Sequence, residues 1–81
     1  MPEQSDYSRI SAEIEKEIRS GRREPGSKLP SLSELREIHG VSDTVLKYAM
    51  TWLEARGLIY RKQGKGIFVA TKDRWWTRPR A

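Results

Sequence analysis

Four polar side chains in the second half of the chain have the types and spacing needed to contact a nucleic acid. They recur within "SDTVLKYAMTWLEARG" at intervals that place them on one side of a helix: Thr44, Lys47, Tyr48 and Thr51. Hydroxyl and ammonium groups can hydrogen-bond base edges or attract phosphate, and the major groove of DNA is wide enough to admit a helix. The alternative is a helix whose outer face is polar because it meets water.

A cluster of cations follows in "YRKQGKG". Arg61, Lys62 and Lys65 lie beside Gly64 and Gly66. Glycine lets backbone N–H groups approach phosphate closely, and the cations add an attraction that does not depend on base sequence. The alternative is an ordinary hairpin whose lysines discourage edge pairing. The "GKG" is not a P-loop, because it lacks the G-x-x-x-x-G-K-[ST] pattern and does not open a helix.

The composition argues against an enzyme, a metal site or a membrane protein. The 81 residues include no cysteine and one histidine, His39, which we expect at the surface or capping a helix end. The sequence shows no nucleophile–base pair and no cluster of metal ligands, so we expect no catalytic residue, cofactor or metal. No apolar run approaches the ~20 residues of a membrane span. One small, soluble, cytoplasmic domain is the simplest interpretation.

Positive charge is concentrated in the second half of the chain, which has a formal net charge of +5 overall. Residues 1–40 contain seven Lys/Arg and eight Asp/Glu, whereas residues 41–81 contain nine and three. This asymmetry is typical of a protein with one face that meets a polyanion. Anionic lipids or acidic proteins would also be attracted to this positive charge.

The elements that must position these side chains begin with an amphipathic helix within residues 5–21. Ser5 or Asp6 can cap its start, and Gly21 can end it in the left-handed conformation. Its apolar stripe is expected to face inward: Tyr7, Ile10, Ile14 and Ile18.

The connection to the next helix is predicted to contain a turn and a very short strand. Pro25-Gly26 fits a type II turn, because glycine takes the positive φ that the second central position requires. Lys28-Leu29 is the predicted strand, with Leu29 buried.

A short second helix is predicted over residues 31–39. Ser31 and Glu34 have the S-x-x-E spacing of a capping box, and Gly40 ends the helix. Three apolar residues are expected to point inward: Leu32, Leu35 and Ile38.

The third helix is predicted over residues 43–56, with Ser42 as its N-cap and Gly57 beyond its end. On a helical wheel one arc faces the core: Leu46, Ala49, Met50 and Leu53. The four polar side chains and Ala55 lie on the opposite arc. Four residues flank the core arc: Val45 and Trp52 on one side, Asp43 and Glu54 on the other.

Residues 58–62 and 67–70 are β-prone, and "QGKG" between them predicts a hairpin. We therefore expect an α+β fold, mainly α: a winged helix-turn-helix with three helices, a short first strand and a C-terminal β-hairpin wing. The predicted DNA-binding domain spans residues 6–71. Residues 72–81 form a basic, tryptophan-containing tail without clear periodicity.

Several motifs, in order and spacing, resemble one family. "PGSKLPS", "SELREIHGVS" and "AMTWLEARGLIYRKQGKGIFV" are similar to the winged helix-turn-helix domain of GntR-type bacterial regulators over roughly residues 7–70. The resemblance implies a dimer on operator DNA, with the third helix in the major groove and the wing in the adjacent minor groove. It implies contacts from the helix and the wing: Asp43, Thr44, Val45, Lys47, Gln63 and Gly64. Ser31 and Ser42 would meet phosphates.

The sequence departs from the family at several reading positions. The family usually has arginine at position 43 and often at position 33, where this chain has Asp43 and Ser33. Val45 and Lys47 replace a favoured threonine and arginine. Longer members carry an effector-binding and dimerising domain, and an 81-residue chain is either a short member or a fragment. No small-molecule effector is expected from this chain alone.

Asp43 is an unexpected residue for a surface that meets DNA. A carboxylate at the first helical position stabilises the helix terminus by about 0.3–1 kcal/mol. It can also accept a hydrogen bond from a cytosine amino group. In a third interpretation it repels DNA, and the helix no longer reads bases. We favour the first two acting together.

The tail offers its own alternatives. Trp75 and Trp76 either cover the hydrophobic body or pair with a second chain, and Arg78-Pro79-Arg80 could enter a narrow minor groove. The sequence as a whole predicts a sequence-specific DNA-binding regulator, a repressor acting as a homodimer on double-stranded DNA. The alternatives are a winged-helix protein-interaction module and an architectural or excision accessory factor.

Overall fold

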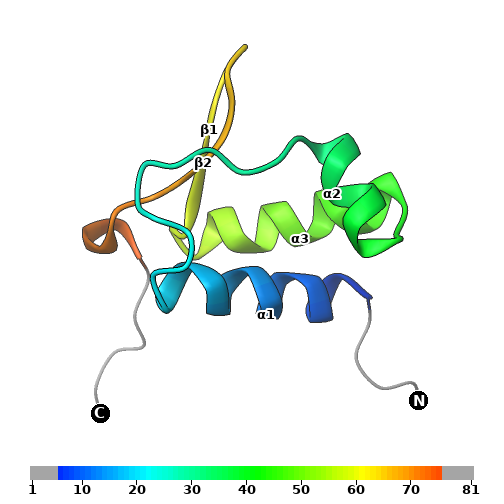
Figure 1. The fold of residues 1–81 in the computed structure, drawn as a ribbon, viewed down its shortest axis with the longest axis horizontal. Coiled ribbons are helices and arrows are strands. Elements are labelled where there is room, and N and C mark those ends of the chain that lie inside the picture. The colour runs from blue at the N-terminus through cyan, green and yellow to red at the C-terminus, as the bar shows by residue number, and fades with distance from the viewer. Residues whose placement is uncertain (1–5, 76–81) are drawn as a thin grey trace.

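The structure, a computed structural model, describes residues 6–75. Its elements follow the order α1 (Asp6–Arg19), α2 (Leu32–His39), α3 (Asp43–Ala55), β1 (Ile59–Lys62), β2 (Gly66–Val69) and the 3₁₀ helix η1 (Lys72–Arg74). In Figure 1, α1 packs along α3, α2 lies over the start of α3, and the β1–β2 hairpin rises from the end of α3 on the same side as α2. We call this hairpin the wing. The predicted winged helix-turn-helix is confirmed.

The core forms where α1, α3 and the base of the wing meet. The predicted inward arc of α3 is confirmed, since all four of its residues are fully buried, and so are the three isoleucines of α1. Tyr7 differs from the other members of that stripe because it lies at the start of α1, where its side chain is 39% exposed. None of the helices among residues 6–75 is long and apolar enough to cross a membrane.

The connection before α2 adopts the predicted turn and strand. The N–H of Ser27 donates to the carbonyl of Glu24 at 3.0 Å, and Gly26 has φ 85°, as a type II turn requires. Lys28 pairs with Phe68 of β2 in an isolated antiparallel bridge. Leu29, which is buried, donates its N–H to Ile67 at 2.8 Å. The connection therefore lies along β2 and anchors the wing.

The second strand of the wing begins one residue earlier than predicted, at Gly66, and ends one residue earlier, at Val69. β1 and β2 are antiparallel, with Ile59 opposite Val69 and Lys62 opposite Gly66. The turn residues are 63–65, and the N–H of Lys65 donates to the carbonyl of Lys62 at 2.9 Å. Gly66, predicted to lie in the reversal, is therefore part of the strand ladder.

Two predictions about α2 are wrong. Ile38, expected to face inward, is 65% exposed, whereas Leu35 is fully buried and Leu32 is half-buried. Residues three apart lag the α-helical period by about 60° at each step, so a short helix with this spacing buries only its central member. The surface alternative for His39 is also wrong, since its side chain is only 12% exposed and lies against α1. Its position agrees with the other alternative, because His39 is the last residue of α2.

Candidate nucleic-acid interface

The polar side of α3 is exposed as the helical wheel predicts. Thr44, Lys47, Tyr48 and Thr51 are all solvent-exposed, and we call these four residues the outward face of α3. Val45, a contact implied by the resemblance, is half-buried and packs against the core. The outward face therefore offers two hydroxyl groups, an ammonium and a phenol to a partner.

The turn between α2 and α3 holds this face in place through local hydrogen bonds. Gly40, at φ 66°, ends α2 in the left-handed conformation, and its N–H donates to the carbonyl of Arg36 at 2.8 Å. The N–H of Val45 donates to the hydroxyl of Ser42 at 3.3 Å, which caps α3. Val41 packs against the core between the two helices. The start of α3 is thus fixed relative to α2.

Asp43, the first residue of α3, has a partner that the sequence did not suggest. Nη1 of Arg36 lies 3.7 Å from its Oδ1, and the two side chains are 49% and 54% exposed. The helix-terminus interpretation of Asp43 agrees with its position, because a negative charge is favourable in a first turn. The guanidinium also offsets that charge on the surface where a polyanion is expected.

At the wing tip, Arg61, Lys62, Gln63, Gly64 and Lys65 are all exposed. The side chains of Arg61 and Lys62 contact other side chains of the domain. Nε of Arg61 lies 3.4 Å from Oε1 of Glu54 on α3. Nζ of Lys62 lies 5.4 Å from the centre of the Phe68 ring. The first contact joins the exposed surface of α3 to β1 of the wing.

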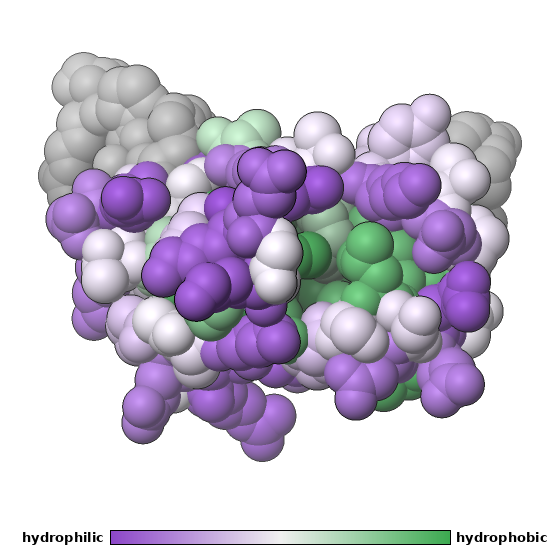
Figure 2. Space-filling view, turned by 90° about the horizontal axis from the view of Figure 1, so that it is seen from above, coloured by the Kyte–Doolittle hydropathy of each residue, from purple (hydrophilic) through white to green (hydrophobic). Residues whose placement is uncertain are grey.

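Ser31 and the wing share a groove of about 520 Å³ between the α1–α2 connection and the hairpin. Its edges carry cations and hydroxyl groups: Lys28, Ser31, Ser33, Arg61, Lys62 and Lys65. Apolar side chains form part of the lining: Leu29, Leu32 and Ile67. Figure 2, seen from the wing side, shows this hollow as a hydrophobic area bordered by hydrophilic residues.

The capping box at Ser31 adds an electrostatic feature to one side of the groove. The backbone N–H of Ser31 donates to the Glu34 carboxylate at 2.8 Å, and the N–H of Glu34 donates to the Ser31 hydroxyl at 3.1 Å. The first hydrogen bond is the largest cause of a pKa of Glu34 below its usual value. The Ser31 hydroxyl is therefore occupied as an acceptor, and its proton remains available to a phosphate.

The predicted contact residues form three groups rather than one. Ser31 and the five wing residues line the groove, whereas Tyr48 and Thr51 line a separate, mostly apolar hollow with Tyr7 and Trp52. The rings of Tyr7 and Tyr48 lie 6.0 Å apart. Ser42, Asp43, Thr44 and Lys47 occupy the start of α3. Within residues 6–75, no hydrogen bond or ion pair joins Thr44 or Lys47 to the wing.

Sequence reasoning missed three residues beside these groups. Lys28 lines the groove, Arg36 contacts Asp43, and Tyr7 packs against the outward face of α3. Lys28 could have been found, because the predicted strand 28–29 had to pair with the hairpin. No periodicity connects Arg36 to Asp43 across the turn, so that pair carries no signal in the sequence.

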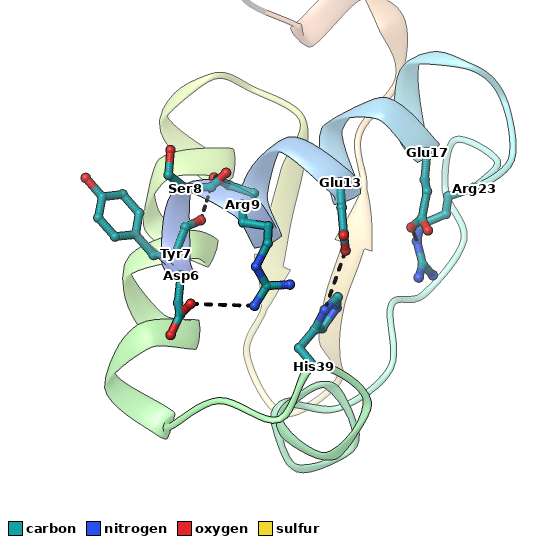
Figure 3. A network of polar contacts seen from close by, with 9 residues as sticks. Asp6, Tyr7, Ser8, Arg9, Glu13, Glu17, Arg23 and His39 are labelled. Atoms are coloured by element: carbon teal, nitrogen blue, oxygen red, sulfur yellow. Dashed lines mark hydrogen bonds and ion pairs between the residues drawn. The ribbon is translucent and has the colours of Figure 1, made fainter. Parts of the chain in front are cut away.

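A network of polar contacts holds α2 and the connection against α1, as Figure 3 shows. Nδ1 of His39 lies 3.7 Å from Oε1 of Glu13, and Nε of Arg23 donates to Glu17 at 2.7 Å. These contacts are structural, since they orient the helix-turn-helix on α1. In the described part of the chain, no group of histidine, aspartate and glutamate residues could hold a metal ion.

Trp75 covers the hydrophobic body, which was one of the two interpretations of the tail. It packs against the core, and its indole N–H donates to the carbonyl of Ala70 at 3.1 Å. The guanidinium of Arg19 lies 5.3 Å from its ring centre. In Figure 1 this segment lies at the end of α1 and α3 that is opposite α2, away from the start of α3. Trp76 and Arg78-Pro79-Arg80 lie outside the described residues.

Comparison with known proteins places this geometry in one family. Residues 6–69 match the gntR family of bacterial regulatory proteins. The Uxu operon regulator of Haemophilus influenzae is 38% identical over 63 residues, which are 78% of this chain and 24% of that protein. The transcriptional repressor NagR of Bacillus subtilis is 34% identical over 64 residues, 79% of this chain and 26% of that protein.

Comparison with solved structures shows that the fold is also that of a gntR-type DNA-binding domain. A crystal structure of AraR(DBD) in complex with an operator superposes with a TM-score of 0.81 at 35% identity, covering 84% of this chain and 82% of that one. The chain spans about a quarter of the length of the curated relatives it matches. The described domain is a winged helix-turn-helix that belongs to the gntR family of bacterial regulatory proteins, a family of DNA-binding transcription regulators and not of enzymes.

Proposed function

We propose that the domain binds double-stranded DNA with sequence preference and represses transcription by occupying its site. The observation that carries the proposal is the exposed, polar outward face of α3, which begins at a turn fixed by hydrogen bonds. The wing adds cations beside glycines that let the backbone approach phosphate. A relative is named a repressor and another has been solved on operator DNA, which agrees with this proposal.

The proposal assigns different contacts to α3 and to the wing. Thr44, Lys47 and the first turn of α3 contact bases in the major groove, where each base pair presents a distinct pattern of donors and acceptors. Tyr48 and Thr51 contact the sugar-phosphate backbone beside it. The wing residues 61–65 contact the minor groove or the backbone, with Ser31 and Ser42 on phosphates. Phosphate contacts fix the register, and base contacts give the preference.

Binding of duplex DNA over a salt series tests the proposal. We expect the logarithm of the affinity to fall linearly with the logarithm of salt concentration, with a slope of roughly −0.9 per phosphate contacted. Lys65→Ala should reduce the magnitude of that slope by about 1 on all sequences, since a lost phosphate contact is not sequence-dependent. Lys16→Ala, on the exposed surface of α1, removes the same charge away from the wing and serves as the control. A flat salt response in the wild type contradicts the proposal.

A protein-interaction module is the second candidate function, because apolar side chains line the groove beside the wing. It predicts weak, sequence-independent DNA binding and capture of a partner that buries Leu32 and Ile67. Selection of bound fragments from a genomic library separates the remaining possibilities. A regulator enriches a defined two-fold sequence, whereas an architectural factor enriches none.

A further inference from the structure

We propose that Arg36 of α2 reads a guanine in the bound duplex, and that Asp43 is its positioning residue. The inference rests on the proposed DNA binding and deepens it, because Arg36 lies outside both α3 and the wing. The Arg36–Asp43 ion pair, at 3.7 Å, brings a side chain of α2 to the first residue of the helix assigned to the major groove.

The backbone beneath this pair is fixed on both sides of the turn. The carbonyl of Arg36 accepts from the N–H of Gly40 at 2.8 Å and from that of Val41 at 3.3 Å. Leu35, the preceding residue, is fully buried, and Ser42 caps α3 directly before Asp43. The backbone positions of Arg36 and Asp43 are therefore fixed relative to each other. Their side chains can still rotate, and the ion pair restricts this rotation.

The exposure of the pair is the second part of the argument. Arg36 is 49% exposed and Asp43 is 54% exposed, so neither charge is buried within the fold. An exposed ion pair of this kind contributes little to stability. Its main consequence is the location of the guanidinium, which lies beside the first turn of α3.

The chemistry of the guanidinium points to guanine. Arginine carries five N–H donors in a planar fork, and the contact with Asp43 is made through one terminal nitrogen, Nη1. The other donors can form the bidentate contact to guanine O6 and N7, which is the commonest specific contact of arginine with a base. Lysine carries a similar charge but lacks the planar fork, so it replaces arginine on a phosphate more readily than in this bidentate contact with a base edge.

The experiment is selection of bound sequences from random duplexes, followed by affinity measurements on the selected site and on single-base variants of it. The proteins are the wild type, Arg36→Ala, Arg36→Lys and Asp43→Asn. Arg22→Ala is the matched control, because Arg22 is an exposed cation beside the C-terminal half of α1. Thermal unfolding of each variant shows whether it is folded at the temperature of the assay.

We expect the two Arg36 variants to lose discrimination at one G·C pair by roughly 5- to 150-fold, the range for a good bidentate contact. Asp43→Asn should weaken preference at that same position, because the amide keeps the shape and loses the charge that positions Arg36. The double variant Arg36→Ala/Asp43→Asn should lose little more discrimination at that position than Arg36→Ala alone, since the two residues act as one unit. Arg22→Ala should select the wild-type sequence with unchanged preference at every position.

Three results overturn the inference. Arg36→Ala could select the wild-type sequence with the same preference, which leaves the proposed function intact and removes Arg36 from base reading. Arg36→Ala could weaken binding to all sequences equally while Arg36→Lys restores it, which makes Arg36 a phosphate contact. A wild type that selects no sequence and binds without salt dependence contradicts the proposed function itself. If Arg36→Ala is unfolded, Arg36→Lys alone tests the inference, and unchanged preference at every position in that variant overturns it.

Discussion

At the scale of single residues, the reciprocal cap of Ser31 and Glu34 connects stability to pH. Glu34 has a pKa below its usual value of 4.5 in the folded protein, chiefly because it accepts the Ser31 N–H. A lowered folded pKa means that the carboxylate stabilises the fold at pH values above 4.5. That stabilisation is lost as the pH falls from 4.5 through the lower folded value. Acid should therefore weaken the start of α2.

Glu34→Gln should lose less stability than the wild type between about pH 6 and pH 3, because glutamine keeps an acceptor and does not titrate. The measurement is the free energy of unfolding by urea at both pH values. Glu37→Gln, an exposed glutamate on the same helix, is the control and should follow the wild type. Identical pH profiles for all three proteins would contradict the role of the cap.

Ile38 and Leu35 form a second contrast at this scale. Leu35→Ala should destabilise the protein by about 2–5 kcal/mol, because it leaves a cavity in the core. Ile38→Ser should change the free energy of unfolding by no more than about 0.5 kcal/mol, because its side chain already meets water. Chemical denaturation measures both. A large loss with Ile38→Ser would show that the exposed side chain is covered in solution.

At the scale of elements, the junction of α3, β1 and η1 depends on one glycine. Gly57 has φ 74°, and a Cβ built there would lie 1.9 Å from the carbonyl oxygen of Arg74. Gly21 also has a positive φ, of 90°, but a Cβ there would meet nothing within 4 Å. The two glycines share the backbone requirement and differ only in the space around them.

Gly21→Ala should therefore cost about 1–2 kcal/mol, the penalty of the left-handed conformation alone. Gly57→Ala should cost more, because the backbone of η1 must move away and Trp75 then loses its hydrogen bond to Ala70. Urea denaturation gives the free energies of unfolding, and the NMR signal of the Trp75 indole N–H reports on the hydrogen bond. Equal losses in both variants would mean that η1 does not pack on Gly57 in solution.

The elements also show what the sequence could and could not predict. The three helices, the serine caps of α2 and α3 and the wing follow from local rules: apolar periodicity, serine caps and glycines that end helices. The predicted cap of α1 at Ser5 lies outside the described residues. The bridge of Lys28 to Phe68 was predicted only as a short strand without a partner. The Arg36–Asp43 contact and the packing of Trp75 depend on tertiary geometry, which periodicity does not encode. The sequence therefore predicted the exposure of the outward face of α3. It did not predict the tertiary contacts that support this face.

At the scale of the whole molecule, the charge asymmetry and the fold agree. The wing rises on the same side of α3 as α2, so the wing and its exposed cations Arg61, Lys62 and Lys65 stand on the side away from α1 (Figure 1). The first half, whose charges nearly cancel, supports that surface through α1, which pairs with Arg23 and makes a polar contact with His39. This division explains how a chain of 81 residues can have both a core and a polyanion-binding surface.

A domain of this size contacts only a small half-site, so high affinity should require two copies on a two-fold sequence. We expect two copies per duplex when inverted half-sites lie about 10–10.5 base pairs apart, or at a multiple of that spacing, since both copies then face the same side of the DNA. Native mass spectrometry or calorimetry gives the stoichiometry. Scrambling one half-site should lower the affinity far more than twofold. Binding of one copy per duplex, with equal affinity for the intact and the half-scrambled site, would show that the domain acts alone.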